Sequence, residues 1–347
     1  MQDESRDSHS GRPNGFNILT RRGLIQVAAI SAGTAALTRL EASPAEAAIQ
    51  TPKGKTPPLT ADEIAAIEKA IGKKGTLNGA QALYTVSLPR NDLKVTIKGE
   101  PIPIPFGFGG WVSFKRSVDG KSVMVMSDTV LLQDEVTPVM DAALANGLEV
   151  AAVHNHFFYE ESRIAYMHLH GMGTNAADLA ARYAKAISVS KLSPANQPPA
   201  GPPPAKTAKD IFDVPALDKI VGYSGAVNGP VYKYTVDRAD LTVMDMGVEM
   251  TAAIGLNSWA SFAGTPQAAH VAGDIAMLES EVNPVIRALR KNNLEVVAVH
   301  SHMLMEQPRI IFLHYYGTGT ADKLALGFRA ALNELGKHGG NMGAMRM

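Results

Sequence analysis

The chain has 347 residues, of which 46% are hydrophobic and 19% charged, a balance typical of globular proteins and not of disordered ones. Lysine plus arginine and aspartate plus glutamate both number 33, and this zero net charge argues against nucleic acid as a partner, since that binding needs a basic excess. The absence of cysteine excludes disulfides, thiolate metal sites and a lipid-modified N-terminal cysteine.

The N-terminal segment 1–47 has the parts of an export signal. Two adjacent arginines, Arg21 and Arg22, precede an apolar run of small residues at 27–37, and a small-x-small cleavage motif ends at Ala47. The arginine pair is typical of a twin-arginine (Tat) signal, and a Sec signal that happens to contain two arginines is the alternative. The run is shorter than the about 20 apolar residues of a membrane span. We therefore expect export by the Tat machinery to the periplasm or the medium, with no stable membrane anchor after cleavage.

The rest of the chain is a tandem duplication. Four pairs of segments match: 67–79 and 217–229, 90–93 and 238–241, 111–114 and 259–262, 148–156 and 294–302. A proline-rich stretch at 191–207 separates the copies and is predicted to be an extended linker. We expect one repeat domain at 58–190 and a second at 208–340.

Each copy shows the same order of expected elements. In the first copy these are a helix at 62–71, strands near 82–87, 93–98, 111–114 and 122–126, a helix at 136–144, strands at 149–157 and 164–170, and a helix at 175–187. Strands outnumber helices and hairpins are frequent, so we predict an α+β fold in which each repeat is a mainly antiparallel sheet with two or three helices. The duplication permits the two sheets to pack as one pseudo-symmetric body.

Histidines recur at matching positions in the two copies. They are His154, His156 and His168 in the first copy, and His300, His302 and His314 in the second. A hairpin folded about residue 161 places His154 opposite His168, and one folded about residue 307 places His300 opposite His314, with all six on one face. Such imidazoles suit an ion whose metal–nitrogen bonds are about 2.0–2.1 Å for zinc. We predict a transition-metal site in each copy, for Zn, Mn, Fe or Cu.

Charged residues accompany the histidines in sequence. Glu160 and Glu306 occupy matching turn positions, where each is a candidate for a fourth metal ligand or a general base. Arg163 and Arg309 also match, and are candidates for orienting an anionic group or pairing with the glutamates.

Other retained residues have simpler expected roles. Two acids precede the central helix of each copy: Asp128 and Glu135, matched by Asp274 and Glu281. Acids in this place cap free N–H groups and complement the helix dipole, and a role in the histidine site is the alternative. The only two tryptophans, Trp111 and Trp259, also match and are expected to anchor the core.

Three longer motifs resemble a known family. They are Leu-Leu-Gln-Asp-Glu-Val-Thr-Pro-Val-Met at 131–140, Glu-Val-Ala-Ala-Val-His-Asn-His at 149–156 and Tyr-Met-His-Leu-His-Gly at 166–171. This pattern resembles the LppY/LpqO family, which is built around a domain of unknown function. The resemblance implies an exported, often lipid-anchored bacterial protein and implies no activity. This chain lacks the lipid-bearing cysteine of that pattern, so it looks soluble rather than anchored.

Two functions are compatible with these residues. In the first, the protein is a periplasmic metalloprotein whose ion activates a water or polarises a substrate, with Glu160 or Glu306 as base. In the second, it is a non-catalytic envelope protein that binds a small molecule or partner and whose histidines are structural. The triple-histidine pattern favours the first, and the absence of any complete catalytic constellation beyond it favours the second.

Overall fold

The computed structural model describes residues 55–337, and both repeats belong to one compact unit within it. The predicted signal at 1–47 and the end of the second predicted domain, 338–340, lie outside the described residues. Among the described residues, no helix combines the length and apolar character that crossing a membrane requires.

The first repeat is a six-stranded antiparallel sheet with three helices. Its sheet has the order β1 (Thr76–Asn78), β2 (Leu83–Pro89), β5 (Gly109–Arg116), β6 (Val123–Leu132), β9 (Ile164–Gly173) and β7 (Glu149–His154). Its helices are α1 (Ala61–Ile71), α2 (Val136–Ala145) and α3 (Ala176–Ile187). A small sheet joins β4 (Glu100–Ile102), β3 (Val95–Ile97) and β8 (Glu160–Glu161), and a 3₁₀ turn, η1 (Ile104–Phe106), follows β4.

The second repeat has the same topology. Its sheet has the order β10 (Ala226–Asn228), β11 (Val231–Asp237), β14 (Asn257–Gly264), β15 (Ala269–Met277), β17 (Ile311–Gly319) and β16 (Glu295–His300). Its helices are α4 (Ala208–Ile211), α5 (Val214–Val221), α6 (Val282–Lys291) and α7 (Ala321–Leu332). The hairpin of β12 (Val243–Asp245) and β13 (Val248–Met250) leads to a 3₁₀ turn, η4 (Ala252–Ile254). The predicted α+β fold with two antiparallel sheets is confirmed.

Local sequence explains where the first helix begins and ends. Thr60 and Glu63 form a capping box at the start of α1, in which each side chain accepts a hydrogen bond from the other residue's backbone N–H. The helix ends at Gly72, whose φ of 77° is accessible to glycine at little cost.

Buried ion pairs fix the entry to the central helix of each repeat. Arg90 is fully buried and contacts Asp92 and Glu135 at 2.8 Å each. Glu135 also accepts a hydrogen bond from the backbone N–H of Leu132, so it caps the turn that starts α2. Arg238 and Glu281 repeat the arrangement at 2.8 Å in the second repeat.

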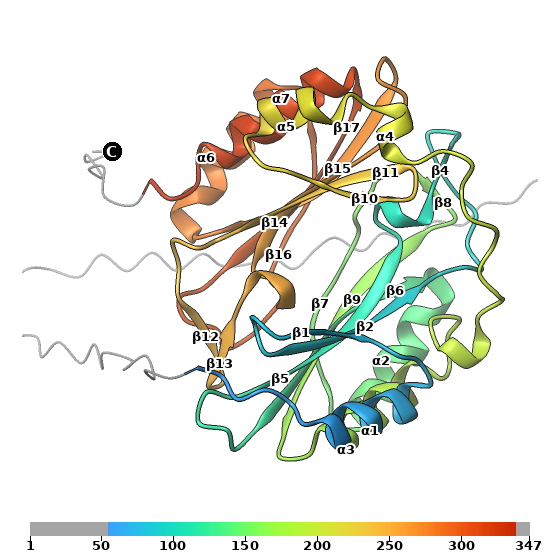
Figure 1. The fold of residues 1–347 in the computed structure, drawn as a ribbon, viewed down its shortest axis with the longest axis vertical. Helices are drawn as coiled ribbons and strands as arrows, with labels where there is room; N and C mark the ends of the chain where they lie inside the picture. Colours follow the sequence, from blue (N-terminus) through green and yellow to red (C-terminus); the bar gives the residue numbers. More distant parts are fainter. Residues whose placement is uncertain (1–54, 338–347) are drawn as a thin grey trace, which may run out of the picture. The chain divides into compact units, whose positions relative to one another are not determined.

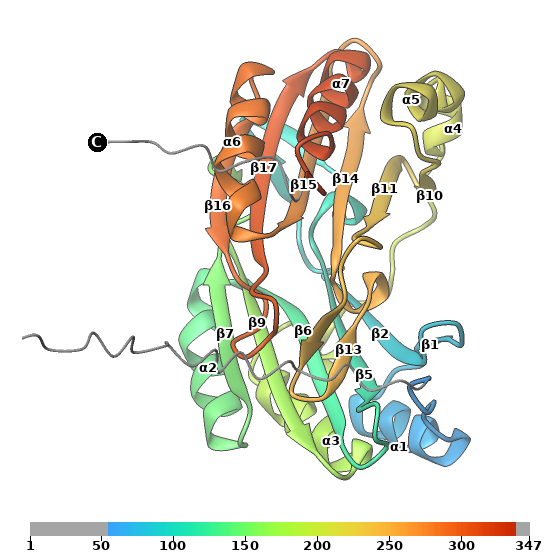
Figure 2. The ribbon, with the colours of Figure 1, turned by 90° about the vertical axis from the view of Figure 1, so that its left-hand side faces the viewer.

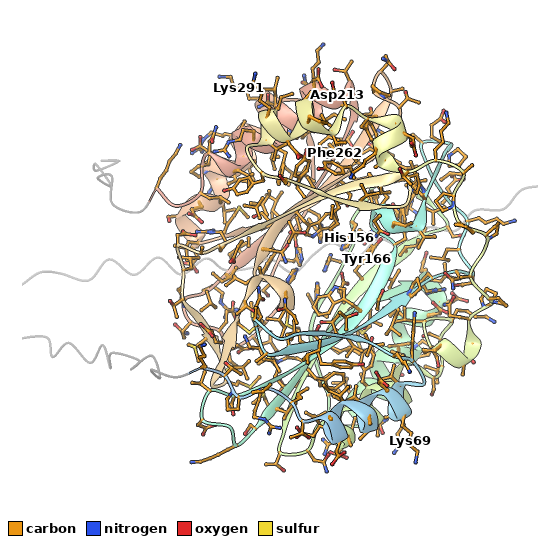
Figure 3. All side chains as sticks on the ribbon, in the orientation of Figure 1. Lys69, His156, Tyr166, Asp213, Phe262 and Lys291 are labelled. Carbon is orange, nitrogen blue, oxygen red and sulfur yellow. The ribbon has the colours of Figure 1, made fainter. Side chains whose placement is uncertain are left out.

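The helices of each repeat lie on the outer face of its own sheet, and the inner faces of the two sheets meet (Figures 1 and 2). Figure 3 shows His156 and Tyr166 between the sheets, whereas Lys69 and Lys291 point outward from the helix layers.

The two repeats exchange packing segments across this interface. Phe106, in η1 of the first repeat, belongs to the same apolar cluster as Ala272 and Tyr316 of the second sheet. Conversely, Val248 and Ile254 of the second repeat belong to an apolar cluster that includes buried side chains of β2 and β6 in the first repeat. Burial of these segments in the opposite repeat joins the halves through apolar surface, the main source of stability in such contacts.

Candidate metal centre

Each sheet has one histidine within a central strand, and this histidine is directly opposite an aspartate on the neighbouring strand, forming a row with it. In the first sheet, Asp128 on β6 is directly opposite His168 on β9. In the second sheet, Asp274 on β15 is directly opposite His314 on β17. Because side chains at directly opposed positions point to the same face, each row presents a carboxylate beside an imidazole toward the other repeat.

The remaining four histidines come from the ends of the edge strands. His154 closes β7 and His300 closes β16, and His156 and His302 follow two residues later. His156 lies flat on the ring of Tyr166, with centroids 3.2 Å apart, and His302 lies on Phe312 at 3.5 Å. Five of the six histidines are buried and His300 is partly buried.

The predicted hairpin register is wrong by two residues. His154 pairs with Tyr166 and His300 with Phe312, while His168 and His314 are opposite Ala152 and Ala298. The hairpins are therefore centred on residues 160 and 306, and β7 and β16 each carry a bulge. These pairs lie between the bulge and the turn, so the position of the turn, and not the bulge, accounts for the difference from the predicted register.

All six histidines form one cluster shared by the repeats, rather than one group in each repeat. The ring centroids of His156 and His314 are 3.7 Å apart, and those of His168 and His302 are 4.1 Å apart. Within the repeats, by contrast, His154 and His168 are 5.0 Å apart. The imidazole ring nearest to His168 is thus that of His302, and the ring nearest to His314 is that of His156, each from the other repeat.

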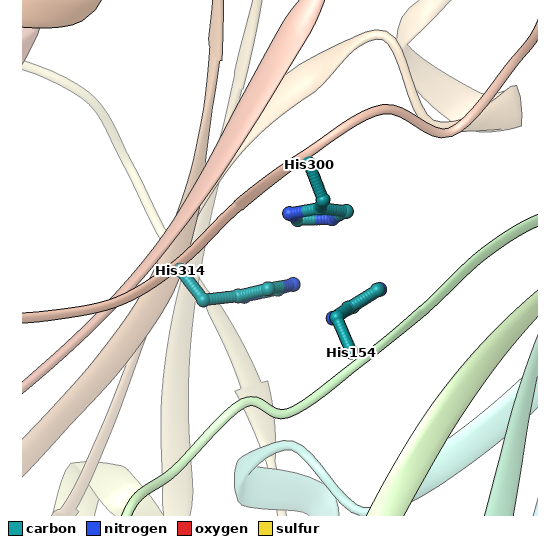
Figure 4. Close-up of side chains that lie close together, drawn as sticks. All are labelled: His154, His300 and His314. Atoms are coloured by element: carbon teal, nitrogen blue, oxygen red, sulfur yellow. The ribbon is translucent and has the colours of Figure 1, made fainter. Parts of the chain in front are cut away.

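Two triads of ring nitrogens are close enough to share an ion. His154, His300 and His314 form one, and His168, His300 and His302 form the other, with ligand atoms within 4.8 Å of one another in each. Figure 4 shows the first triad, in which His154 approaches from the opposite repeat to His300 and His314. Both triads include His300, so they describe a single centre.

The hydrogen bonds of the strand histidines leave a lone pair for a ligand. His168 Nδ1 donates to the carbonyl of Ser127, and His314 Nδ1 donates to the carbonyl of Gly273, each at 3.1 Å. This fixes the proton on Nδ1, so the buried Nε2 atoms carry lone pairs and have no hydrogen-bond partner among the described residues. Donation of the second ring nitrogen to a carbonyl is the usual support of a metal-binding histidine.

Several other ring nitrogens of the cluster are also without a hydrogen bond among the described residues. They are both ring nitrogens of His154 and of His156, and Nδ1 of His300 and of His302. An unsatisfied buried polar atom costs about 1–3 kcal/mol, so a water or an ion that contacts these nitrogens would stabilise the cluster.

Burial keeps the cluster neutral. It lowers the pKa of His168 to about 4 and that of His314 to about 3. The pKa values of the other four histidines are also well below the usual 6.5, through burial and then mutual repulsion. Neutral imidazole is the form that binds metal.

Asp128 and Asp274 lie in the site and not at helix ends. Asp274 Oδ2 is 3.2 Å from His302 Nε2 and 3.9 Å from His314 Nε2. Burial raises the pKa of Asp128 to about 7 and that of Asp274 well above its usual value. Capping falls instead to Glu135 and Glu281, so the expected capping role was right for the glutamates and wrong for the aspartates. An acid within an apolar strand run, repeated in both copies, was the signal for a site role.

The predicted charged residues of the turn have local contacts. Glu160 and Glu306 are buried and accept hydrogen bonds from the backbone N–H of Ile164 and Ile310, at 3.5 and 3.1 Å. Arg309 Nη1 lies 3.3 Å from Glu306 Oε1. Arg163 is exposed. A role of the glutamates as ligand or base therefore stays a prediction, and the carboxylates found in the histidine rows are the aspartates.

Both tryptophans are partly buried and line a cavity between the repeats, and Trp111 also packs against the apolar cluster that contains Val248 and Ile254, so the predicted core role is confirmed in part for Trp111. Trp111 is directly opposite Asp128, and Trp259 is directly opposite Asp274, so both extend the histidine rows. The ring of Trp259 lies 6.1 Å from that of His314.

Fold and site together define a duplicated α+β protein with a histidine cluster between its repeats. Residues 65–189 and 215–334 each match the family model described as Domain of Unknown Function (DUF1259), one match for each repeat. The protein belongs to this family, and the predicted duplication of a domain of unknown function is confirmed. The LppY/LpqO resemblance stays a prediction.

No curated protein matches the chain. Among solved structures, the chain is similar to the trimeric bacterial microcompartment shell protein PduB, with 12% identity and a TM-score of 0.17, over 75% of this chain and 89% of that one. It is also similar to EtuB from Clostridium kluyveri, with 9% identity and a TM-score of 0.18, over 75% and 88%. TM-scores this low carry no argument about fold or function.

Proposed function

We propose that this protein binds one transition-metal ion between its two repeats, through histidines of both. The observation that carries the proposal is the cluster of six histidines, in which eight of the twelve ring nitrogens have no hydrogen-bond partner among the described residues. One ion is proposed for each chain because both triads depend on His300.

The donor set narrows the choice of metal. Neutral imidazoles with one or two carboxylates suit Zn, Mn, Fe or Cu, and imidazole is a poor ligand for Ca and Mg. Affinity for such ligands is generally greatest for copper among the divalent ions. Loading of a folded protein before export would limit capture of copper outside the cytoplasm.

The residues around the centre suit the activation of a bound water. A metal ion in a site with an open position lowers the pKa of its water toward 7. Asp274 lies within 4 Å of two candidate ligands, and Asp128 holds the matching place in the first sheet. A carboxylate there either completes the coordination or accepts a proton from the bound water.

The test is the metal content of the mature protein, purified without chelator or histidine tag from its own host. Elemental mass spectrometry should find about one ion per chain in the wild type and almost none in a His154→Ala/His300→Ala double variant. His270→Ala is the matched control, since His270 lies outside both triads and pairs with Tyr316. Equal metal content in the double variant and the His270→Ala control would refute the site, and a wild-type protein without metal would refute metal binding.

We also propose export through the Tat pathway, as for a soluble protein of the LppY/LpqO type. The support is the arginine pair before the short apolar run of the N-terminal segment. An Arg21→Lys/Arg22→Lys variant should accumulate uncleaved in the cytoplasm, measured by fractionation and mass spectrometry. Normal export of that variant would point to the Sec pathway.

A further inference from the structure

A cavity of about 330 Å³ lies against the histidine cluster and is lined by both repeats. Its lining includes His168, His302 and Asp128 on the side of the metal centre, and Trp111, Trp259 and Lys233 elsewhere. The volume is at the lower end of the about 300–1,000 Å³ in which proteins hold small molecules. A molecule in this cavity would face candidate metal ligands and both tryptophans at once.

Lys233 makes the cavity asymmetric. Its counterpart in the first repeat is Thr85, which also lines the cavity and is hydrogen-bonded to Ser113 at 2.7 Å. The Lys233 ammonium lies 4.3 Å from the centre of the Trp259 ring. Asp128 and Asp274 attract it electrostatically, but among the residues that the structure describes no carboxylate forms an ion pair with it within 4.0 Å. A cation of this kind next to a metal centre is a site for a ligand's negative charge.

The charges of the centre set the charge of the ligand. Lys233 is the one cationic side chain besides the histidines among the residues that line this cavity, and Asp128 lies in the same lining, with Asp274 beside His302. One cation therefore suits a ligand with a single negative charge, such as a carboxylate, whereas the second charge of a phosphate dianion would have no cationic side chain of its own and would lie near the aspartates in a poorly solvated place. The two indole rings add flat apolar surface, which favours a ligand with a planar or cyclic body.

We propose that this cavity binds a small organic monocarboxylate with a planar or cyclic apolar body, held by Lys233 beside the metal centre. The inference rests on the proposed metal-binding function and adds to it the class of ligand. The two repeats then contribute unequally, since only the second supplies the cation.

Benzoate is the probe, and benzyl alcohol is its neutral control. Because Trp111 and Trp259 are the only tryptophans of the chain, intrinsic tryptophan fluorescence reports on this cavity alone. Benzoate added to the metal-loaded mature protein should change the fluorescence, with Kd confirmed by calorimetry. Lys233→Met should weaken benzoate binding about 10- to 100-fold and leave benzyl alcohol binding unchanged. Lys121→Met removes an exposed charge and should change neither.

A second variant tests whether weaker binding reflects the lost charge or a misfolded protein. Lys233→Thr introduces the residue that the first repeat already carries at this position, and it should match Lys233→Met in benzoate affinity. Equal benzoate affinity in wild type and both variants would overturn the inference, as would a wild-type fluorescence that does not respond.

Metal content of the same samples separates this inference from the proposed function. Both Lys233 variants should keep their metal, and a joint loss of metal and benzoate would show that Lys233 supports the metal centre instead of the ligand. If the wild type holds no metal yet binds benzoate through Lys233, the metal proposal fails and the carboxylate site stands.

Discussion

Replacing His300 with alanine should remove most of the affinity for metal, because His300 belongs to both triads. Structural zinc sites bind with about 10–16 kcal/mol through four ligands, so one ligand accounts for roughly 2.5–4 kcal/mol. His300→Ala should therefore weaken zinc binding roughly 100- to 1,000-fold, measured by competition with a chelator of known affinity. His170→Ala is the matched control, since His170 is a buried histidine that contacts Asp245 at 3.2 Å and lies outside both triads.

The shared centre also makes a prediction across the repeats. His168 and His302 come from different repeats yet belong to one triad, so the losses from His168→Ala and His302→Ala should not add in the double variant. If the two losses add fully, or if His300→Ala and His170→Ala weaken zinc binding equally, the shared geometry is refuted.

Three further predictions concern stability. At a free metal concentration 1,000 times Kd, binding contributes about 4.1 kcal/mol, so chelation should lower Tm by roughly 7 °C in a thermal melt of a chain this long; an unchanged Tm would refute preferential binding to the native state. In metal-free protein, burial places the pKa of His168 and His314 at about 4 and 3, below the 6.5 of the unfolded chain, so the unfolded state binds more protons in between. The raised pKa values of the buried Asp128 and Asp274 act in the opposite direction, but all six histidines of the cluster act toward a loss of stability, so the free energy of unfolding should fall as pH drops from 6.5 toward 3. Urea titrations in which the free energy of unfolding rises toward pH 3 would contradict neutral burial. Finally, Arg90→Met leaves Glu135 buried without its partner and should cost about 3–5 kcal/mol in urea unfolding, whereas Lys121→Met should cost almost nothing.

The helices and strands could be predicted from the sequence because they depend on residues that are close together in the chain. The predicted helix at 62–71 corresponds to α1, and the predicted strand at 164–170 falls within β9. Apolar periodicity and turn residues determine such elements over a few neighbouring positions, and the duplication supplied each pattern twice.

Which histidines lie together depends on how the two sheets pack, and the sequence around each histidine does not determine that packing. Strand alternation placed His168 and His314 on an inward face, but it is the meeting of the two sheets that puts each beside the other repeat's His-x-His pair. The register error has a different origin: the hairpin turn is centred on residue 160 instead of 161, and the pairing His154 with Tyr166 follows from that turn, since the bulge of β7 lies beyond this pair, between Val150 and Ala152. Asp128 was assigned to capping because its distance from α2 in sequence suggested it, whereas β6 continues to Leu132 and keeps it in the sheet.

A site formed by two repeats of one chain can acquire a substitution in one repeat while the matching residue of the other repeat stays the same. Were the repeats separate identical chains, any substitution near the axis would appear twice, and a cation introduced at Lys233 would face an identical cation from the other chain. Covalent fusion removes that constraint, because Thr85 and Lys233 are encoded independently. The same freedom shows where His170 contacts Asp245 while its counterpart Tyr316 contacts His270. The duplicated chain thus keeps a two-fold arrangement of histidines while its halves present different side chains, Thr85 and Lys233, to the cavity between them.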